Sequence, residues 1–342
     1  MSAFINRIGT AVPAHDVHAA FLEFASAGLA DAKSRNVFDR MAARSGIGHR
    51  FSHMRPGDIG RGEVDAGGFY RRGAFPGTAA RMQRFEVHAL ELALAAVAGL
   101  GSLEGISHVV VASCTGFTAP GLDLQLTQRL GLSAHVARVM VGFMGCSAAV
   151  PALRSADAIV RADPAARVLV VNVELCSLHL RETADVETAL TFMLFGDGAT
   201  AAIVSSDAEG IGLGAFRSSV IPGTAGLITW AIGDHGFEMY LSGRVPARIA
   251  EALRLDPPGE FDLWAVHAGG RTVLDAVEIA LSLPASCLAQ SRKVLQEYGN
   301  MSSATLMFVL AGMLRDGCQG SGFAMAFGPG MVAETFRFCI AG

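Results

Sequence analysis

Runs of apolar residues that stop at a turn recur along the whole chain. The segments 106–113 (ISHVVVAS) and 167–173 (RVLVVNV) are almost uninterrupted apolar runs. Strands of this kind are covered on both faces, as they are in layered α/β proteins. Segments 3–10, 322–327 and 331–340 are also strand-like. The pattern therefore predicts a sheet in the interior of the protein.

The residues between these strands predict helices, and the helical spacing of apolar residues is clear in 18–32. The predicted helices cover 18–32, 37–49, 78–99, 121–132, 147–162, 188–194, 245–255, 271–281, 292–298 and 304–314. Strands that alternate with helices favour a mainly parallel sheet with helices packed on its faces. We therefore predict the α/β fold class.

The composition changes near residue 207. Residues 211–240 contain glycine-rich loops and segments that predict antiparallel strands. After this segment, strands that lead into a glycine turn and a helix begin again. The sequence contains no short repeat, but the order of strand, glycine turn and helix occurs in both parts of the chain. This similarity predicts two similar α/β halves, 1–207 and 208–342, stacked around a common layer.

The composition is apolar, which indicates that much of the chain is buried. Of the 342 residues, 51% are hydrophobic and 17% are charged, so part of the apolar surface is expected at a subunit interface. The net charge of -4 provides no basic surface for nucleic acid. We expect neither a signal peptide nor insertion into a membrane, because no segment has the required pattern.

Six cysteines are scattered along the chain, and none forms a CxxC pair. A chain of this size does not need disulfides, so we expect reduced thiols and a cytoplasmic location. No residues have the spacing of a metal site, and we expect no bound metal.

The stretch 139–153 (VMVGFMGCSAAVPAL) predicts a strand, a tight turn, Cys146 and the start of a helix. The positive end of a helix dipole and unpaired backbone N–H groups favour a thiolate over a thiol at such a position. The glycines allow the sharp turn and a close approach to a ligand. The alternative is a structural cysteine in an apolar core, where many free cysteines lie.

Two further polar residues occupy similar positions. His267 ends the predicted strand 261–267 in the sequence AVHAGG, and Asn300 precedes a helix in YGNMSSA. Taken singly, a structural histidine and a helix N-cap are the plainer interpretations. Because sites collect at strand ends in α/β sheets, the three residues together predict one catalytic site.

Arg40 and Arg44 lie one helical turn apart in the predicted helix 37–49. Surface charges of this kind usually form a solvated basic face. The functional alternative is a clamp for an anionic ligand such as a phosphate.

Five stretches occur in an order that resembles the chalcone synthase-like (type III) polyketide synthases: GFMGCSAA, LFGDGATAAIV, WAVHAGGRTVLDAVE, YGNMSSAT and AFGPGMVAE. The resemblance extends from about residue 3 to about residue 340, and residues 233–246 are similar to bacterial members. It implies a thiolase-type fold with αβαβα layers and an intimate homodimer. It also implies CoA thioester substrates, no acyl carrier protein and no cofactor.

Residue roles follow from the same resemblance. Cys146 matches the nucleophile that takes the starter acyl group, and His267 and Asn300 match the pair that activates it and holds the extender unit. Phe195 matches an aromatic gate between the CoA tunnel and the cavity. Arg40 and Arg44 match cationic positions that meet the CoA phosphates.

Three positions depart from the family pattern. A third cationic position is Val37, so the grip on CoA is expected to be weaker or differently built. Ala268 replaces a proline after the histidine, which is expected to change the stiffness of the loop and leave the chemistry intact. A second aromatic gate aligns near Met239.

Three more residues are candidates for the cavity wall. Cys114 follows a neighbouring strand and is either a cavity residue or a plain buried thiol. Ser302 either faces the cavity or caps a helix. Trp230 either narrows the chamber or packs in the core.

The resemblance predicts an enzyme that condenses an acyl-CoA starter with several malonyl-CoA units and cyclises the product to a pyrone, a resorcinol or a related aromatic. Among bacterial members, long acyl starters that give alkylpyrones or alkylresorcinols are common, which favours this outcome. One alternative is a single-round condensing enzyme of the β-ketoacyl synthase III type, which serves an acyl carrier protein. The other is an inactive acyl-binding partner in a dimer.

Overall fold

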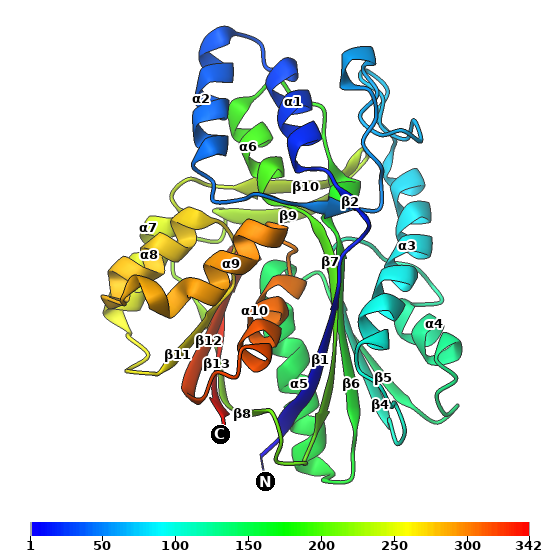
Figure 1. Ribbon diagram of the computed structural model, residues 1–342, viewed down its shortest axis with the longest axis vertical. Coiled ribbons are helices and arrows are strands. Elements are labelled where there is room, and N and C mark those ends of the chain that lie inside the picture. Colours follow the sequence, from blue (N-terminus) through cyan, green and yellow to red (C-terminus); the bar gives the residue numbers. More distant parts are fainter. Residues whose placement is uncertain (1, 342) are drawn as a thin grey trace.

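A nine-stranded sheet runs through the molecule in the order β11-β12-β13-β8-β1-β7-β6-β4-β5 (Figure 1). The computed structural model describes residues 2–341. The strands are β1 (Phe4–Ala11), β4 (His108–Ser113), β5 (Ala137–Gly142), β6 (Val168–Leu175), β7 (Asp197–Ser205), β8 (Ile211–Val220), β11 (Leu263–Val266), β12 (Gly320–Gly328) and β13 (Val332–Ile340).

The sheet has two parts that meet at a short junction. Strands β1 and β4 to β7 come from the first half of the chain, and β8 and β11 to β13 come from the second. The register between β1 and β8 contains two residue pairs, Phe4 with Gly212 and Ile5 with Ile211. The two parts can therefore enclose a layer of helices between them.

The prediction of a mainly parallel sheet is wrong. The parallel pairs are β4 with β5, β4 with β6, and β11 with β12. The other neighbours in the sheet are antiparallel. The chain reverses direction between β6 and β7 because the intervening segment rises into a cap above the sheet (Figure 1).

Helices form three layers that alternate with the two parts of the sheet (Figure 1). Helices α3 (Thr78–Ala98) and α4 (Leu122–Arg129) cover the outer face of the first part. Helices α5 (Ala149–Ala162) and α10 (Ala304–Arg315) lie between the parts. Helices α7 (Val245–Leu255) and α8 (Arg271–Leu281) cover the outer face of the second part, with α9 (Ala289–Tyr298) beside α10. The expected αβαβα layering is confirmed.

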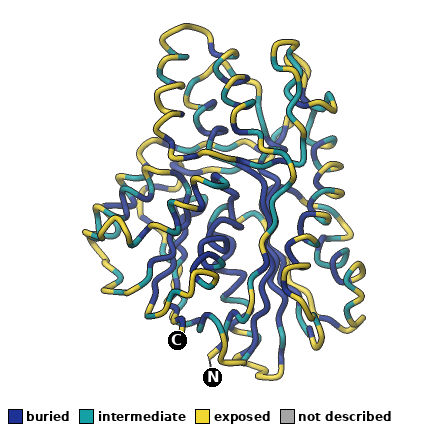
Figure 2. The backbone as a smooth tube through the Cα atoms, viewed as in Figure 1, coloured by how far each residue is buried: buried dark blue, intermediate teal, exposed yellow. Residues whose placement is uncertain are grey.

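Successive side chains of one strand pack on opposite faces of the sheet, and this alternation explains the layers. In β4, Val110 packs into the central cluster between the two parts, whereas Val109 and Val111 pack outward against α3. In β11, Ala265 packs inward and Trp264 packs outward against α8. Strands β4 and β11 therefore have two buried faces, as apolar runs predict, and burial is dense in the central strands and in α10 (Figure 2).

A cap of three helices lies above the sheet (Figure 1). Helices α1 (His18–Gly28), α2 (Ala32–Ala43) and α6 (Val186–Leu194) share a separate apolar cluster. Two small ladders lie under the cap, formed by β2 (His15–Asp16) with β3 (Phe51–Ser52) and by β9 (Ile228–Gly233) with β10 (Gly236–Leu241).

Several elements differ from their predicted bounds, and helix α2 differs most. It begins at Ala32, where Asp31 caps it through a 2.8 Å hydrogen bond from the Ser34 N–H, and it ends at Ala43 instead of His49. Strand β5 lies at the edge of the sheet, and Val139 and Met140 are each 40% exposed. Among residues 2–341, no helix is long and apolar enough to cross a membrane.

Candidate active site

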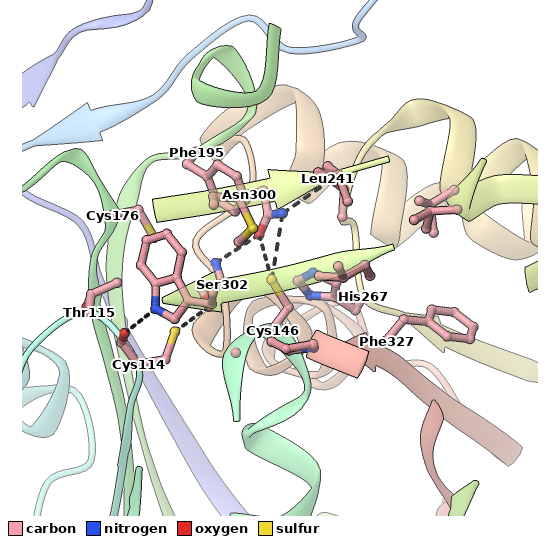
Figure 3. Close-up of a pocket in the computed structure, with 18 of the residues that line it drawn as sticks. Cys114, Thr115, Cys146, Cys176, Phe195, Leu241, His267, Asn300, Ser302 and Phe327 are labelled. Atoms are coloured by element: carbon pink, nitrogen blue, oxygen red, sulfur yellow. Dashed lines mark hydrogen bonds between the residues drawn. The ribbon is translucent and has the colours of Figure 1, made fainter. Parts of the chain in front are cut away.

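Three segments bring Cys146, His267 and Asn300 to one cavity (Figure 3). Cys146 lies in the turn between β5 and α5, and His267 follows β11 directly. Asn300 lies between α9 and α10. The strand-end argument therefore placed Cys146 and His267 correctly, and the structure joins them to Asn300.

The turn at Cys146 is tightly constrained. Phe143 and Gly145 both have positive φ, of 60° and 59°. A side chain at Gly145 would overlap the ring of Pro329, so only glycine lets the FGPG segment approach the cysteine. A short 3-10 turn, Gly145–Ser147, precedes α5 and places the Cys146 sulfur at the cavity wall.

Asn300 holds its side-chain amide in one orientation. Its Oδ1 accepts the backbone N–H of Ser302 at 2.8 Å, and its Nδ2 donates to the Gly269 carbonyl at 3.2 Å. The Cys146 Sγ lies 3.9 Å from Oδ1 and 4.0 Å from Nδ2. Asn300 is not an N-cap, because α10 begins at Ala304.

The ring of His267 is buried, with 2% of the residue exposed. Among the described residues, neither ring nitrogen has a hydrogen-bond partner. Its backbone N–H donates to the Met325 carbonyl at 2.8 Å, which fixes the end of β11 beside β12. The ring is therefore available to a substrate.

Burial acts against charge on either partner of the cysteine–histidine pair. It raises the pKa of Cys146 to about 11 and lowers the pKa of His267 to about 4. The predicted stabilisation of a thiolate by the helix start does not overcome this desolvation. A lone thiolate or a lone imidazolium is unfavourable, so charge is expected to form on both groups together.

The predicted wall residues line the same cavity as the three central residues. The cavity has an empty volume of about 810 Å³, including its part open to solvent. The predicted residues in its lining are Phe195, Cys114, Ser302, Met239 and Trp230. The rest of the wall is mainly apolar, and Phe327 and Pro329 of the FGPG segment contribute to it.

Trp230 spans one side of the cavity and is fixed at its polar end. Its indole N–H donates to the Cys114 carbonyl at 2.7 Å. His179 links the residue after Cys114 to β10, because its Nε2–H donates to the Thr115 carbonyl at 2.7 Å and its Nδ1 accepts the Phe237 N–H at 2.9 Å. Burial lowers the pKa of His179 to about 3, so the ring is neutral and structural.

Cys114 is held by a buried acid. Glu174 accepts the backbone N–H of Cys114 at 3.0 Å and the hydroxyl of Thr115 at 2.8 Å, and it also accepts the Ser303 hydroxyl. The Cys114 sulfur lies 3.2 Å from the Ser302 hydroxyl. Burial, with Glu174 nearby, raises the pKa of Cys114 well above its usual value, so this cavity thiol is neutral.

Phe195 is tied to Asn300 through the backbone. The two residues form a parallel bridge, in which the Asn300 N–H donates to Leu194 at 2.8 Å and the Gly196 N–H donates to Asn300 at 3.0 Å. Arg50 donates to the Phe195 carbonyl at 2.7 Å. The aromatic ring at the end of α6 therefore has a fixed position relative to Asn300.

Arg40 and Arg44 do not line the cavity. Both are exposed, Arg40 in the last turn of α2 and Arg44 directly after it. The Arg44 carbonyl accepts a 3.1 Å hydrogen bond from Arg271. Neither Arg40 nor Arg44 forms an ion pair within residues 2–341. Val37 is half-buried in the same helix, and Ala268 is fully buried.

The sequence argument missed Cys176 and Phe192, which also line the cavity. Cys176 directly follows β6, which continues to Leu175 and not just to the predicted end at 173. The same strand-end signal that identified Cys146 would have identified Cys176 had the strand been extended. Phe192 lies inside α6 and carried no such signal.

Comparisons with known proteins agree with this geometry. The family described as "Chalcone and stilbene synthases" matches through its N-terminal domain over residues 2–208 and its C-terminal domain over residues 213–339. The Mycobacterium tuberculosis protein named "Alpha-pyrone synthesis polyketide synthase-like Pks18" is 35% identical, with 76% of this chain and 73% of that protein covered.

Solved structures give the same result over nearly the whole length. PKS-I from the brown alga Ectocarpus siliculosus is 30% identical, with a TM-score of 0.88 and 99% of this chain and 98% of that chain covered. 1,3,6,8-Tetrahydroxynaphthalene synthase from Streptomyces coelicolor A3(2) is 27% identical, with a TM-score of 0.87 and 99% of each chain covered. The chain therefore belongs to the chalcone and stilbene synthase family and is a type III polyketide synthase.

Proposed function

We propose that the enzyme loads an acyl group from acyl-CoA onto Cys146 and extends it by repeated condensation with malonyl-CoA. The observation that supports this proposal is the convergence of Cys146, His267 and Asn300 on one largely apolar cavity. Such a cavity admits a thioester and excludes most of the water that would hydrolyse it.

Loading needs a nucleophilic sulfur. Because burial disfavours either charge alone, the proton of Cys146 moves to His267 as the thioester arrives, and the sulfur attacks the acyl carbon. The bond from the acyl carbon to the CoA sulfur then breaks. The CoA thiolate takes up a proton, and the acyl group remains on Cys146.

Extension begins with loss of carbon dioxide from malonyl-CoA. The electron pair of the broken carbon–carbon bond forms an enolate, whose oxygen needs preorganised donors and not a strong base. The His267 ring N–H and the Asn300 Nδ2 are the donors available at the cavity. The enolate attacks the acyl carbon on Cys146, the sulfur leaves as a thiolate, and the chain is two carbons longer and attached to CoA. The Cys146 sulfur then attacks this new thioester and releases CoA, so that the next round can begin.

Cationic residues near the cap suit the CoA phosphates. Arg40 and Arg44 are exposed, and the Arg44 carbonyl accepts a hydrogen bond from Arg271 at the N-terminus of α8. Within residues 2–341 no carboxylate pairs with either Arg40 or Arg44. We assign them to the CoA phosphates, with Val37 leaving a smaller cationic set. The side chains of the cavity supply the chemistry themselves, so CoA thioesters enter as substrates and no other cofactor is required.

The edge of the sheet suits a homodimer. Strand β5 exposes Val139 and Met140, and Phe117 and Met144 nearby are 41% and 37% exposed. Unpaired apolar edge strands are normally covered in native proteins. We assign this edge to contact with a second copy of the chain. A cytoplasmic location would keep its six free thiols reduced.

We assign the product to the α-pyrones, which form by ring closure of the extended chain. The support is the name of the mycobacterial relative, a protein of α-pyrone synthesis. A single-round condensing enzyme would use the same three residue types but would stop after one extension. An inactive partner would not need all three residues in one cavity.

Intact-protein mass spectrometry tests this proposal. Wild-type protein and the Cys146→Ala variant are mixed with a panel of acyl-CoAs, with and without malonyl-CoA. Adducts on the wild type alone, together with soluble products that carry several ketide units, would support the proposal. Adducts that never give products beyond one extension would overturn it in favour of the single-round enzyme, and absence of any adduct would favour the inactive partner.

A further inference from the structure

A groove lies on the outer face of the second part of the sheet, beside α7. Its empty volume is about 1760 Å³, including its part open to solvent. Strands β8 and β13 form its floor, and the end of α7 with the segment 256–258 forms one side. We call this space the outer groove. Nothing in the proposed reaction uses it.

The floor of the outer groove consists of side chains that alternate with buried ones. In β13, Ala333, Thr335 and Arg337 line the groove, whereas Phe336 and Phe338 pack into the central cluster on the other face. Alternation of this kind is the ordinary geometry of a strand. The three groove residues of β13 therefore form one row.

Strand β8 contributes a second row because its alternation is interrupted. Its register with β13 shifts at a bulge, where Ala215 has a positive φ of 48°. Leu213 and Phe216 both face the central cluster, although three positions separate them. The bulge therefore turns Arg217 and Ser219 toward the groove instead of the core. Bulges that re-aim side chains in this way are common beside active sites.

Most charges that line the outer groove are paired. Arg217 of the floor pairs with Asp256 at the end of α7, at 2.6 Å. Arg248 of α7 pairs with Glu251 at 2.5 Å. These two carboxylates and two arginines balance, and the third arginine of the lining, Arg337, forms no ion pair within residues 2–341. The groove therefore keeps one positive charge without a counter-charge.

Arg337 lies beside the other cation of the floor. Arg217 pairs across the strands with Thr335, so Arg337, two residues further along β13, is its diagonal neighbour. The Arg337 guanidinium lies 5.6 Å from the centre of the Phe261 ring, and the residue is exposed. Its N–H donors are therefore open to an anion in the groove.

The other end of the outer groove is apolar. Ile221 and Pro222 follow the end of β8, and Val220 before them is 70% exposed. Ala333 lines this end of the floor and is four residues from Arg337, which is about 13 Å in an extended strand. The groove therefore offers an apolar surface and a free cation at a fixed separation.

Phe327 separates the outer groove from the catalytic cavity. The residue is 6% exposed and lines both spaces. It lies on the opposite side of the catalytic cavity from Cys176 and Phe195 (Figure 3). Helix α7 also borders both spaces, with Ile249 at the cavity and Ala252 at the groove. The groove is therefore close to the place where the product is formed.

These features define the ligand that fits the outer groove. One unpaired cation suits a single negative charge, whereas the phosphates of CoA or an acidic protein segment would bring several. The apolar end suits hydrocarbon, since burial of methylene groups is favourable without a polar partner. An α-pyrone with a ring hydroxyl has both parts, because it ionises as a vinylogous acid and keeps the hydrocarbon of its starter.

We propose that the outer groove binds the acidic α-pyrone product, with the ring oxyanion at Arg337 and the hydrocarbon substituent at the apolar end. This inference rests on the product class assigned under the proposed function. It gives the released product a site outside the catalytic cavity, so that Cys146 is free for the next starter.

Isothermal titration calorimetry with synthetic 4-hydroxy-6-nonyl-2-pyrone tests this proposal. The catalytic cavity is first blocked by alkylation of Cys146 with N-ethylmaleimide, verified by intact mass. Among the described residues no cysteine lines the groove, so the groove stays unmodified. We expect Arg337→Ala to weaken binding by about tenfold or more, as loss of a hydrogen bond to a charged group does, and Arg337→Lys to restore most of it. Arg254→Ala is the matched control, because Arg254 is exposed on α7 outside the groove.

A second pair of variants tests the apolar end. Ala333→Trp fills the floor of the groove, and Ala208→Trp places the same side chain at an exposed position outside it. The first variant is expected to abolish binding of the pyrone, and the second is expected to retain it. Thermal unfolding identifies any variant that fails to fold, and the Arg337 and Ala333 pairs give independent readings.

Two further probes identify the chemistry that is recognised. The 4-methoxy analogue of the pyrone cannot ionise, so it should bind the wild type at least about tenfold more weakly and should not distinguish Arg337→Ala from the wild type. Dodecanoate carries one charge on a hydrocarbon chain without the ring. If dodecanoate bound more tightly than the pyrone, the groove would be a site for fatty acids, and the assignment to the product would be overturned.

Failure of this inference differs from failure of the proposed function. The titration uses a synthetic pyrone and needs no turnover. Equal affinities in Arg337→Ala and Arg254→Ala, or loss of all binding after alkylation of Cys146, would overturn the groove assignment alone. A wild-type enzyme that makes no pyrone from acyl-CoA and malonyl-CoA would instead overturn the assigned product class, and the inference with it.

Discussion

The backbone N–H of Ser302 donates a 2.8 Å hydrogen bond to Oδ1 of Asn300, two residues earlier. Ser302 adopts a positive φ of 49° to do so, a conformation that is costly for a residue other than glycine. This hydrogen bond occupies the amide oxygen and leaves the Nδ2 group to face Gly269 and Cys146. The strained turn therefore determines that Asn300 presents a donor to the reacting atoms.

Asn300→Asp is expected to remove that donor without changing the shape of the side chain. The oxygen that accepts from Ser302 is retained, but the Nδ2 group becomes a carboxylate oxygen that repels the enolate. Loss of one such donor typically slows the reaction by about 100- to 1000-fold. The measurement is the rate of malonyl-CoA decarboxylation in the absence of a starter.

Ser302→Gly is the control for this substitution. Glycine adopts positive φ without strain and keeps the backbone N–H, so the orientation of Asn300 should survive. We expect its decarboxylation rate to stay within a few-fold of the wild type. If Asn300→Asp were equally active, Asn300 would not be a donor in the reaction.

His267→Gln is expected to slow alkylation of Cys146 by iodoacetamide. Burial raises the pKa of Cys146 to about 11 and lowers the pKa of His267 to about 4, so at pH 7 the thiol and the imidazole are both neutral. The neutral imidazole can take the thiol proton as the sulfur attacks the reagent, and glutamine cannot. A positioned general base contributes about 100-fold or more, so the rate at pH 7 should fall by roughly 100-fold.

The readout is the pH profile of carbamidomethylation at the Cys146 peptide, which should move to higher pH in the variant. Denatured wild type and variant should react equally, which controls for the reagent. Coinciding profiles in the folded proteins would show that His267 does not act as the base.

His179 should make the folded protein sensitive to acid. Burial lowers its pKa to about 3 in the folded state, below the ordinary histidine value of 6.5. The unfolded chain therefore binds a proton first as the pH falls, and stability is lost between about pH 6.5 and 3. One such group contributes a slope of about 1.4 kcal/mol per pH unit to the free energy of unfolding.

Urea unfolding at several pH values and a fixed protein concentration measures this slope. His179→Gln should reduce the slope between pH 4 and 6 by about 1.4 kcal/mol per unit, whatever its stability at pH 7. His135→Gln, at an exposed position, is the control and should leave the slope unchanged. Equal slopes in all three proteins would mean that the ring of His179 is charged in the folded state.

The sequence predicts elements well where local signals agree. Helices α7 and α8 occupy the predicted residues 245–255 and 271–281, because Pro246 lies in the first turn of α7 and a glycine pair precedes α8. Helix α2 was misplaced because its apolar stripe is weak and its start depends on the cap at Asp31. Local signals also contain no information on whether β7 runs parallel or antiparallel to β6. Its direction is determined by the path of the intervening segment through the cap.

Those residues of the candidate site that follow a strand could be predicted wherever the end of the strand could be located in the sequence. Cys146 and His267 follow apolar strands, so their meeting point follows from the fold class. The pKa values of these two residues depend on burial from every side, which no single segment encodes. The place of Phe192 in the cavity wall was also beyond prediction, since it lies inside α6 and not at the end of a strand.

Val139→Glu is expected to break contact between two copies of the chain. Val139 lies on the edge strand β5 and is 40% exposed in the single chain, and Met140 beside it is exposed to the same extent. If this edge is covered in a dimer, a carboxylate there is buried without a partner, which is strongly unfavourable. Ile279→Glu on α8, at a position 69% exposed, is the matched control and should have no effect. Light scattering after size exclusion should give the mass of two chains for the wild type and the control, and of one chain for Val139→Glu. A dimer that survives Val139→Glu would place the interface elsewhere and leave the apolar edge of β5 without an assigned partner.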